Sequence, residues 1–155
     1  MMKTINEILE IKPMQGIGSL KFGASAEEVL KYFGKAEEVE EAEAVEDFKT
    51  IIWHYWSKGC SVFFDEENDL LFSSIEIDNR SAVLWGKPIF EMNEDEIVKL
   101  FKKNGFTEID SEVHEWGEKR ISFDDAMVDF YFEDNYLTSI NYSVSLDDEE
   151  VANWP

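Results

Sequence analysis

The apolar positions of the chain follow two periods, and each period occurs twice. After Ser25 and again after Asn93, apolar residues recur three and four positions apart, which is typical of one buried helix face. A Glu stands three residues after each of these two polar residues, a pattern that predicts a capped helix N-terminus. We therefore expect two helices of roughly ten residues, beginning after Ser25 and after Asn93.

Beyond each predicted helix the period changes to two. Val128, Phe130 and Phe132 alternate with their neighbours, and residues 60–64 alternate in the same way. Such alternation predicts half-buried antiparallel strands. Short polar or Gly-containing turns separate three such strands in each part of the chain. They cover residues 50–57, 60–65 and 70–78, and then residues 119–124, 127–133 and 136–144.

The two patterns match each other as copies of one unit. When Phe22 is set on Phe90, the same offset sets Phe33 on Phe101 and Phe64 on Phe132, and we expect all six side chains to be buried. We predict an α+β fold class: a tandem repeat of a helix packed on a three- to four-stranded antiparallel sheet, with both copies sharing one compact body. The predicted parts are an N-terminal helix and linker (1–15), copy one (16–80), copy two (81–146) and an acidic C-terminal tail (147–155).

Two segments of the first part do not belong to the repeated pattern. Thr4 and Glu7 form a capping box before an apolar stripe, which predicts a further helix that ends at Pro13. Residues 36–47, AEEVEEAEAVED, contain too few apolar side chains to lie in a core. They are typical of a solvated loop or an exposed helix.

The charge of the chain is strongly negative. Asp and Glu number 35 against 14 Lys and Arg, which gives a formal net charge of −21. Nucleic acids and anionic membranes repel such a surface, so we expect neither as a partner. A basic protein partner is favoured instead, or the charge serves only to keep an aromatic-rich protein soluble.

The N-terminal sequence and the single cysteine indicate a compartment. MMKTINEILEIKPMQG lacks the apolar run and the cleavage site of an export signal, and no window approaches the ~18–20 apolar residues of a membrane span. Cys60 has no second cysteine with which to form a disulfide. We expect a reduced cytoplasmic protein, and the sequence leaves its oligomeric state open.

Few residues are candidates for catalysis or metal binding. His54 and His114, the two histidines, do not lie at zinc-ligand spacings from each other or from Cys60. Acidic residues in 65–76 fall at EF-hand positions, but Leu70 stands where the sharp turn requires glycine. The sequence contains no phosphate-binding glycine loop, nucleophile elbow or catalytic triad. We expect no enzyme activity, no cofactor and no metal site.

Aromatic residues are the remaining candidates for function. Trp53 and Trp56 lie three apart on one predicted strand and therefore on opposite faces, so at least one of them should leave the core. Exposed aromatics inside an acidic rim are typical of protein-binding surfaces, although large aromatics in small sheet proteins are most often core residues. The predicted partner contacts are Trp53, Tyr55, Trp56, Glu40, Glu41, Glu43, Asp65 and Asp69.

The order of these segments has a counterpart among known proteins. Four successive segments carry the resemblance: GIGSLKFG, the capped helix after it, the strand IIWHYW and the segment GCSVFFDEENDLLFSSIEI. Through them the chain resembles the superfamily of the BamE outer-membrane assembly lipoprotein and the beta-lactamase inhibitor protein. The resemblance covers about residues 16–145 and implies a helical segment packed on an antiparallel sheet, carried in tandem. Small acidic proteins of this kind are also similar to immunity proteins that neutralise polymorphic bacterial toxins.

One leading hypothesis and two rivals follow. The leading one is a non-enzymatic inhibitory protein, an immunity protein for a basic toxin. Its aromatic residues would anchor the partner, and the carboxylates of residues 37–47 and 65–69 would steer the encounter. The first rival is a scaffolding or assembly module of the BamE-like kind. The second is an enzyme whose site the sequence does not reveal.

Overall fold

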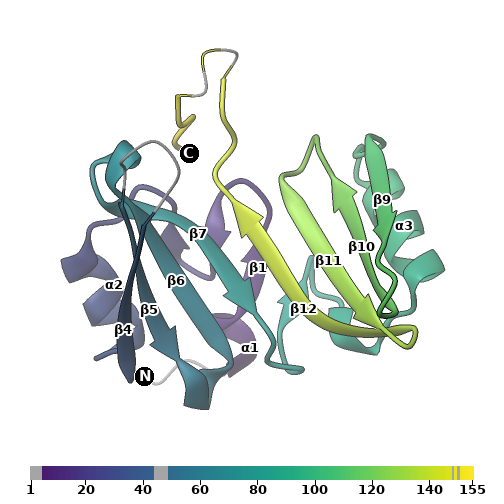
Figure 1. Ribbon diagram of the computed structural model, residues 1–155, viewed down its shortest axis with the longest axis horizontal. Helices are drawn as coiled ribbons and strands as arrows, with labels where there is room; N and C mark the ends of the chain where they lie inside the picture. Colours follow the sequence, from purple (N-terminus) through teal and green to yellow (C-terminus); the bar gives the residue numbers. More distant parts are fainter. Residues whose placement is uncertain (1–4, 44–48, 148, 150) are drawn as a thin grey trace.

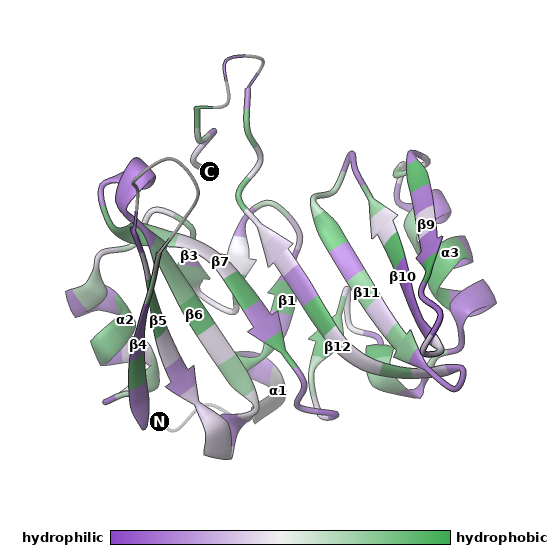
Figure 2. Ribbon diagram, viewed as in Figure 1, coloured by the Kyte–Doolittle hydropathy of each residue, from purple (hydrophilic) through white to green (hydrophobic). Residues whose placement is uncertain are grey.

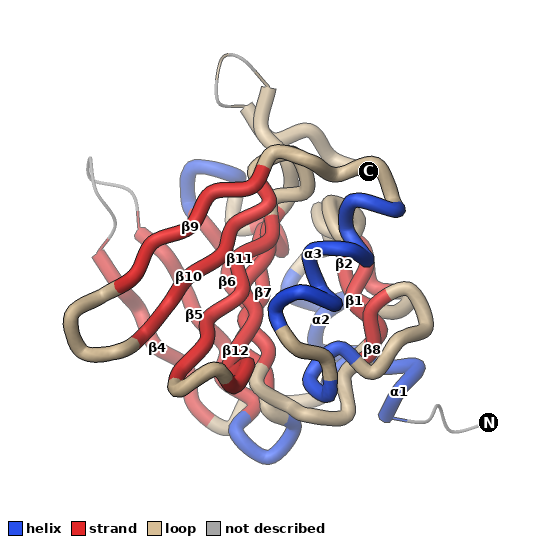
Figure 3. Tube along the Cα trace, turned by 90° about the vertical axis from the view of Figure 1, so that its right-hand side faces the viewer, coloured by secondary structure: helices blue, strands red, loops and turns tan. Residues whose placement is uncertain are grey.

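The computed structural model describes residues 5–43, 49–147, 149 and 151–155. Its elements form two layers (Figure 3). One layer is an eight-stranded antiparallel sheet, and the other contains helices α2 (Ala26–Phe33) and α3 (Glu94–Lys103) together with a four-stranded sheet. We call the side of the large sheet that faces these helices the covered face, and its other side the open face.

The large sheet is one continuous antiparallel array. Its strand order is β4-β5-β6-β7-β12-β11-β10-β9, so β7 and β12 meet in the middle while β4 and β9 form the two edges (Figure 1). Polar and apolar positions alternate along its inner strands, as Figure 2 shows for β11 and β12. The strands are β4 (Glu38–Glu43), β5 (Lys49–Tyr55), β6 (Cys60–Asp65), β7 (Leu71–Ile77), β9 (Ile109–Val113), β10 (Glu118–Phe123), β11 (Val128–Glu133) and β12 (Tyr136–Ser143).

The small sheet is built from the segments that precede the two long helices. Its order is β3-β2-β1-β8, in which β1 runs antiparallel to β2 and parallel to β8. The pairing of β1 with β8 therefore connects the segment before α2 to the segment before α3. The strands are β1 (Glu10–Lys12), β2 (Gly16–Ile17), β3 (Leu20–Lys21) and β8 (Val83–Leu84), and the one-turn helix α1 (Ile5–Ile8) precedes them.

The predicted α+β fold class, a tandem repeat of a helix on a small sheet, is wrong. The described chain is mostly β, with twelve strands in two sheets and only two helices longer than a single turn. The strands of the small sheet have two or three residues each, and so short a segment shows no alternation in the sequence. The sequence therefore predicted no strand in these segments.

The strand β4 corrects a second prediction. It occupies residues that were expected to form a solvated loop or an exposed helix. The prediction was wrong because glutamates lie on both faces of this edge strand, so the sequence shows no alternation of polar and apolar residues. Residues 44–48 of the same acidic segment lie outside the described residues.

The predicted N-terminal helix is also shorter than expected. The described helix α1 ends at Ile8, well before Pro13, and β1 follows it. Leu9 is fully buried in the turn after α1 and Ile11 is fully buried in β1, so the buried side chains beyond Ile8 do not belong to a helix. Thr4, the predicted N-cap, lies outside the described residues.

Both long helices begin where their capping residues predict. The Ser25 Oγ accepts a hydrogen bond from the Glu28 backbone N–H at 3.2 Å. Asn93 and Glu96 form a complete capping box, in which each side chain accepts from the other residue's backbone N–H, at 2.9 and 3.2 Å. These contacts satisfy N–H groups that have no partner inside the helix.

The core lies between the covered face and the second layer. Phe101 of α3 lies against Phe123 with ring centroids 4.2 Å apart and meets the edge of Phe130 at 5.3 Å. Tyr142, in the middle of the sheet, donates its hydroxyl to the Gly16 carbonyl oxygen at 2.8 Å, which links the two sheets. The six phenylalanines expected to be core are all buried, which confirms that prediction: Phe22, Phe33, Phe64, Phe90, Phe101 and Phe132.

The described helices are all short. None of them is long and apolar enough to cross a membrane.

Candidate functional site

The open face carries the side chains that alternate with the core positions. Residues that pair directly across antiparallel strands lie on the same face, so the strand registers define rows of neighbours. We call β4–β7 the first half of the open face and β9–β12 the second half. One row crosses both halves, from β4 to β9: Glu38, His54, Ser61, Glu76, Asn141, Asp129, Ser122 and Asp110.

In the second half, Arg120 neutralises the carboxylates around it. Its Nη2 lies 3.0 Å from a Glu112 oxygen and 3.6 Å from an Asp110 oxygen. Its Nη1 lies 3.8 Å from Asp129 and also donates to the Ser122 hydroxyl. The hydrogen bond to Glu112 raises the pKa of Arg120, and the neighbouring carboxylates add to this. Three acidic groups of this half, Asp110, Glu112 and Asp129, therefore have a cation within the protein.

The first half has no comparable cation. In the alignment of the copies Ile52 stands where Arg120 stands in the second half, and it lies between Glu40 of β4 and Phe63 of β6. Ile52 is buried although it faces the open side. Among the described residues, no Lys or Arg forms an ion pair with Glu38 or Glu40. This half therefore combines apolar and aromatic side chains with glutamates that no strong cation neutralises.

His54 is the centre of a hydrogen-bonded chain on the first half. Its Nδ1 lies 2.8 Å from Ser61 Oγ and its Nε2 lies 3.0 Å from Glu40 Oε1. The Trp56 ring stacks on the imidazole, with centroids 4.2 Å apart and an interplanar angle of 9°. The Trp56 indole N–H then donates to Glu38 at 3.2 Å. These contacts hold an exposed tryptophan and two glutamates in fixed positions.

Ser61, His54 and Glu40 have the composition of a hydrolytic triad. A nucleophilic serine also needs N–H donors aimed at an oxyanion and a path for substrate. Ser61 lies inside β6, where β5 and β7 pair with it on both sides, so the backbone N–H groups around it belong to the sheet. Its exposure is only 8%. We therefore interpret the hydrogen bonds among Ser61, His54 and Glu40 as structural support for Trp56.

The predicted aromatic contacts fall on opposite faces. Trp53 lies on the covered face, where its ring packs 4.9 Å from that of Phe64. Tyr55 is buried and donates its hydroxyl to the Gly34 carbonyl oxygen at 2.9 Å, and this burial raises its pKa to about 12. Only Trp56, with 58% of its surface exposed, is available to a partner.

The predicted acidic contacts on β4 divide between the two faces. Glu40 faces the open side, whereas Glu41 faces the other side and pairs with the Lys49 ammonium at 2.9 Å. Glu43 pairs with Lys49 through the backbone register, and its side chain lies outside what the structure describes. Of the three predicted glutamates, the structure therefore joins only Glu40 to Trp56.

Asp65 and Asp69 lie at the other end of the first half. They follow the end of β6 that is remote from Trp56. Asp65 is held inside the sheet, where it accepts hydrogen bonds from Thr50 at 2.9 Å and from Ser73 at 2.6 Å. Asp69 is exposed in a turn with a left-handed backbone. The structure does not bring these two residues together with the Trp56 cluster.

Sequence reasoning did not include His54 and Glu76 among the contacts, and it included Glu37 and Glu38 only within the carboxylates of residues 37–47. Glu38, Glu37 and His54 surround Trp56, and the Glu37 carboxylate accepts from Ser57 N–H and Oγ at 2.9 and 2.6 Å, which lowers its pKa. Glu76 lies near the middle of the sheet, and the pKa of its carboxyl is raised, first by desolvation and then by the nearby charge of Asp78. Glu38 and His54 could have been found by placing them on the face of Trp56.

A second His-x-Trp segment lies at the opposite edge. His114 stacks on Trp116 with centroids 4.4 Å apart, and Trp116 has 72% of its surface exposed. The nearby Glu112 and Asp110 already pair with Arg120. At this edge, two of the carboxylates on the open face of β9 are therefore neutralised by Arg120.

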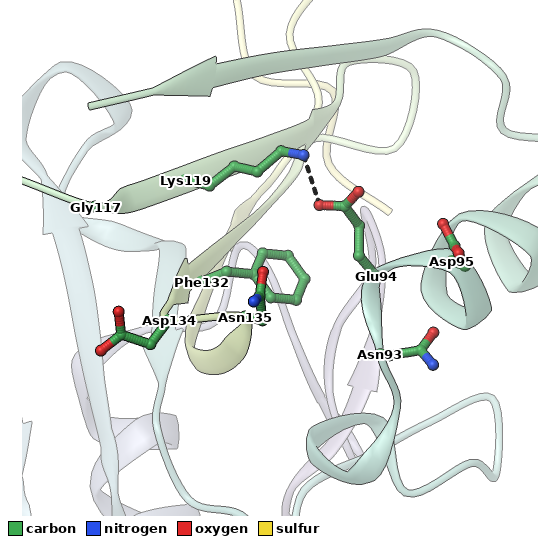
Figure 4. A pocket seen from close by; sticks show the side chains of 8 residues that line it. All are labelled: Asn93, Glu94, Asp95, Gly117, Lys119, Phe132, Asp134 and Asn135. Atoms are coloured by element: carbon green, nitrogen blue, oxygen red, sulfur yellow. Dashed lines mark ion pairs between the residues drawn. The ribbon is translucent and has the colours of Figure 1, made fainter. Parts of the chain in front are cut away.

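A pocket of about 410 Å³ lies beside the N-terminal end of α3 (Figure 4). Lys119 and Glu94 point toward each other across it and form an ion pair of 2.8 Å, which connects β10 to α3. In the part of the chain that the structure describes, no group of three or more His, Cys, Asp or Glu could hold a metal ion. The pocket is lined by Asn93, Glu94, Asp95, Gly117, Lys119, Phe132, Asp134 and Asn135.

Comparisons of the chain with protein-family models, with curated proteins and with solved structures find no match. The resemblance to the BamE and beta-lactamase inhibitor superfamily therefore stays an expectation from the sequence.

Proposed function

We propose that this protein is a non-enzymatic binding protein that inhibits a basic protein partner, and specifically an immunity protein that neutralises a bacterial toxin. One observation carries the proposal. Within the described residues, the glutamates around Trp56 in the first half of the open face form no ion pair with Lys or Arg, whereas Arg120 pairs with Asp110, Glu112 and Asp129 in the second half. We call Glu37, Glu38, Glu40 and Trp56 the Trp56 patch.

The Trp56 patch combines the features of a binding hot spot. Trp is the residue type most often found at such positions, and acidic neighbours give electrostatic complementarity to a basic surface. Trp56 is already fixed by its stack on His54 and its hydrogen bond to Glu38, so it loses little conformational freedom on binding. The exposed tryptophan would therefore anchor the partner while the glutamates select it.

The net charge of −21 supports the same interpretation. A strongly negative protein attracts a basic partner over a Debye length, which is ~8 Å at 0.15 M salt, and this raises the association rate. The same charge repels nucleic acid and anionic membranes, which are therefore not the proposed partners. An immunity protein acts where its toxin acts, and we place this action in the cytoplasm.

The test is affinity capture from the native cell with matched variants. Wild-type protein and the control variant Asp110→Asn/Glu112→Gln should retain a basic partner, because the control changes carboxylates that Arg120 already neutralises. Trp56→Ala and Glu38→Gln/Glu40→Gln should lose it. Expression of the captured partner alone should be toxic, and co-expression with the wild-type chain should restore growth.

Each other result of this experiment contradicts the proposal. A partner that the Trp56 patch variants retain as well as the wild type would place the interface elsewhere. A captured basic protein that is harmless and stays in a stable assembly would favour a scaffolding module of the BamE-like kind. Turnover of a substrate by the purified chain would favour the enzyme hypothesis.

A further inference from the structure

The edge strand β4 lies next to the Trp56 patch and is paired on one side only. It is the outermost strand of the large sheet, hydrogen-bonded to β5, and no other described strand lies beyond it (Figure 1). The backbone N–H and C=O groups along an outer edge can pair with an extended segment of another protein. The structure therefore offers a place for a ninth strand.

The side chains of β4 define which segment would fit there. Glu38 and Glu40 project to the open face, and Val39 and Glu41 project to the other face. Val39 is 62% exposed, and Glu41 is already paired with Lys49. Residues that lie directly opposite each other on antiparallel strands interact most strongly. The complementary segment has Lys or Arg opposite the two open-face glutamates and an apolar residue opposite Val39.

A second copy of this chain does not meet these requirements. Pairing β4 with β4 of another molecule would set glutamates against glutamates, and like charges directly opposite destabilise a sheet. The other edge strand, β9, differs from β4 because its Asp110 and Glu112 form ion pairs with Arg120 of the neighbouring strand β10. The two edges of the large sheet therefore differ. Within the described ranges of the chain, the open-face glutamates of β4, Glu38 and Glu40, form no ion pair with Lys or Arg, whereas Asp110 and Glu112 of β9 pair with Arg120.

We infer that β4 accepts an extended basic segment of the partner as an additional strand, in which Lys or Arg alternates with apolar residues. The inference rests on the proposed function, since it describes how the basic partner is held. The cations of the added strand would lie over Glu38 and Glu40, beside Trp56. Backbone pairing would provide affinity, and the alternation would provide specificity.

A pair of synthetic probes tests backbone pairing directly. One is a short peptide in which Lys and Val alternate, and the other is the peptoid with the same side chains, which has no backbone N–H to donate. We expect the peptide to bind the wild-type chain about tenfold more tightly than the peptoid, because only the peptide can complete the edge. Binding should also slow hydrogen exchange at amides of β4 and leave those of β9 unchanged.

Variants separate this inference from the proposed function. Glu38→Gln/Glu40→Gln should weaken peptide binding about tenfold, through the loss of two cross-strand charge pairs, at an unchanged melting temperature. The matched variant Asp110→Asn/Glu112→Gln should bind as the wild type does. If peptide and peptoid bind equally and both lose affinity in the glutamate variant, the patch attracts cations without strand addition, so the inference fails and the proposed function stands. If neither probe binds the wild type, both fail.

Discussion

We predict that His54→Ala lowers the free energy of unfolding more than His114→Ala does, because His54 is hydrogen-bonded as well as stacked on a tryptophan. The two His-x-Trp segments provide a natural comparison, because in both the imidazole lies flat on the tryptophan two residues later. His54 is buried and hydrogen-bonded at both ring nitrogens. His114 is partly exposed and has one carboxylate contact, at 3.8 Å from Glu112.

The contacts of each histidine give the size of the expected effect. His54→Ala removes two hydrogen bonds worth ~1 kcal/mol each and a ring stack worth ~0.5–1 kcal/mol, so the free energy of unfolding should fall by about 2–3 kcal/mol. His114→Ala removes one partly exposed stack and a long, solvated charge contact, so the loss should be about 0.5–1 kcal/mol.

Urea unfolding followed by far-UV circular dichroism measures both losses, because this observable reports mainly on the backbone of the sheet and is less sensitive than fluorescence to the tryptophans beside the mutated residues. The slope of free energy against urea should stay constant among the variants. The assignment of a supporting role to His54 is refuted if the two variants lose the same stability. It is also refuted if His54→Ala loses less than His114→Ala.

Three further predictions concern the core, the centre of the sheet and the thiol. Phe101→Ala should lower the free energy of unfolding by about 3–5 kcal/mol, because the side chain is fully buried among aromatic rings, and a loss below about 1 kcal/mol in urea unfolding would contradict the described packing. The pKa of Glu76 is raised in the folded state, so its carboxylate lowers stability once it ionises. Glu76→Gln should therefore raise the melting temperature at pH 7. The gain should disappear as the pH falls below the ordinary pKa range of a carboxyl group, where Glu76 is protonated in both the folded and the unfolded protein. An unchanged melting temperature at pH 7 would count against the desolvation of Glu76. Burial raises the pKa of Cys60 to about 12, so iodoacetamide at pH 8 should modify the thiol only in urea, and rapid labelling of the folded protein would show that the site opens.

Local patterns predicted the elements that depend on local interactions. The caps at Ser25 and Asn93 need only residues three positions away, and the buried phenylalanines follow from spacing alone. The short strands β1 and β8 lie far apart in the sequence, and β8 joins the small sheet through its pairing with β1. Their pairing is a tertiary interaction that no short window of sequence encodes.

The candidate site also has features that local patterns predicted and features that they could not predict. Alternation placed Trp53 and Trp56 on opposite faces but could not say which face the helices cover, so Trp53 and Tyr55 were included among the contacts although they face the core. The contacts of His54 come from residues 7 and 14 positions away on neighbouring strands. They become visible only when the strand registers are known.

The meeting of β7 and β12 in the middle of the large sheet has a consequence for how the chain can be divided. A cut in the connection between residues 78 and 82 would place β7 and β12 in different fragments, and would also place β1 and β8 in different fragments. The inner strands β7 and β12 carry more apolar residues and fewer charges than β4, so we expect each fragment to recombine with the other or to aggregate. The two halves of the large sheet therefore depend on each other, since each provides the strand that pairs with the inner strand of the other.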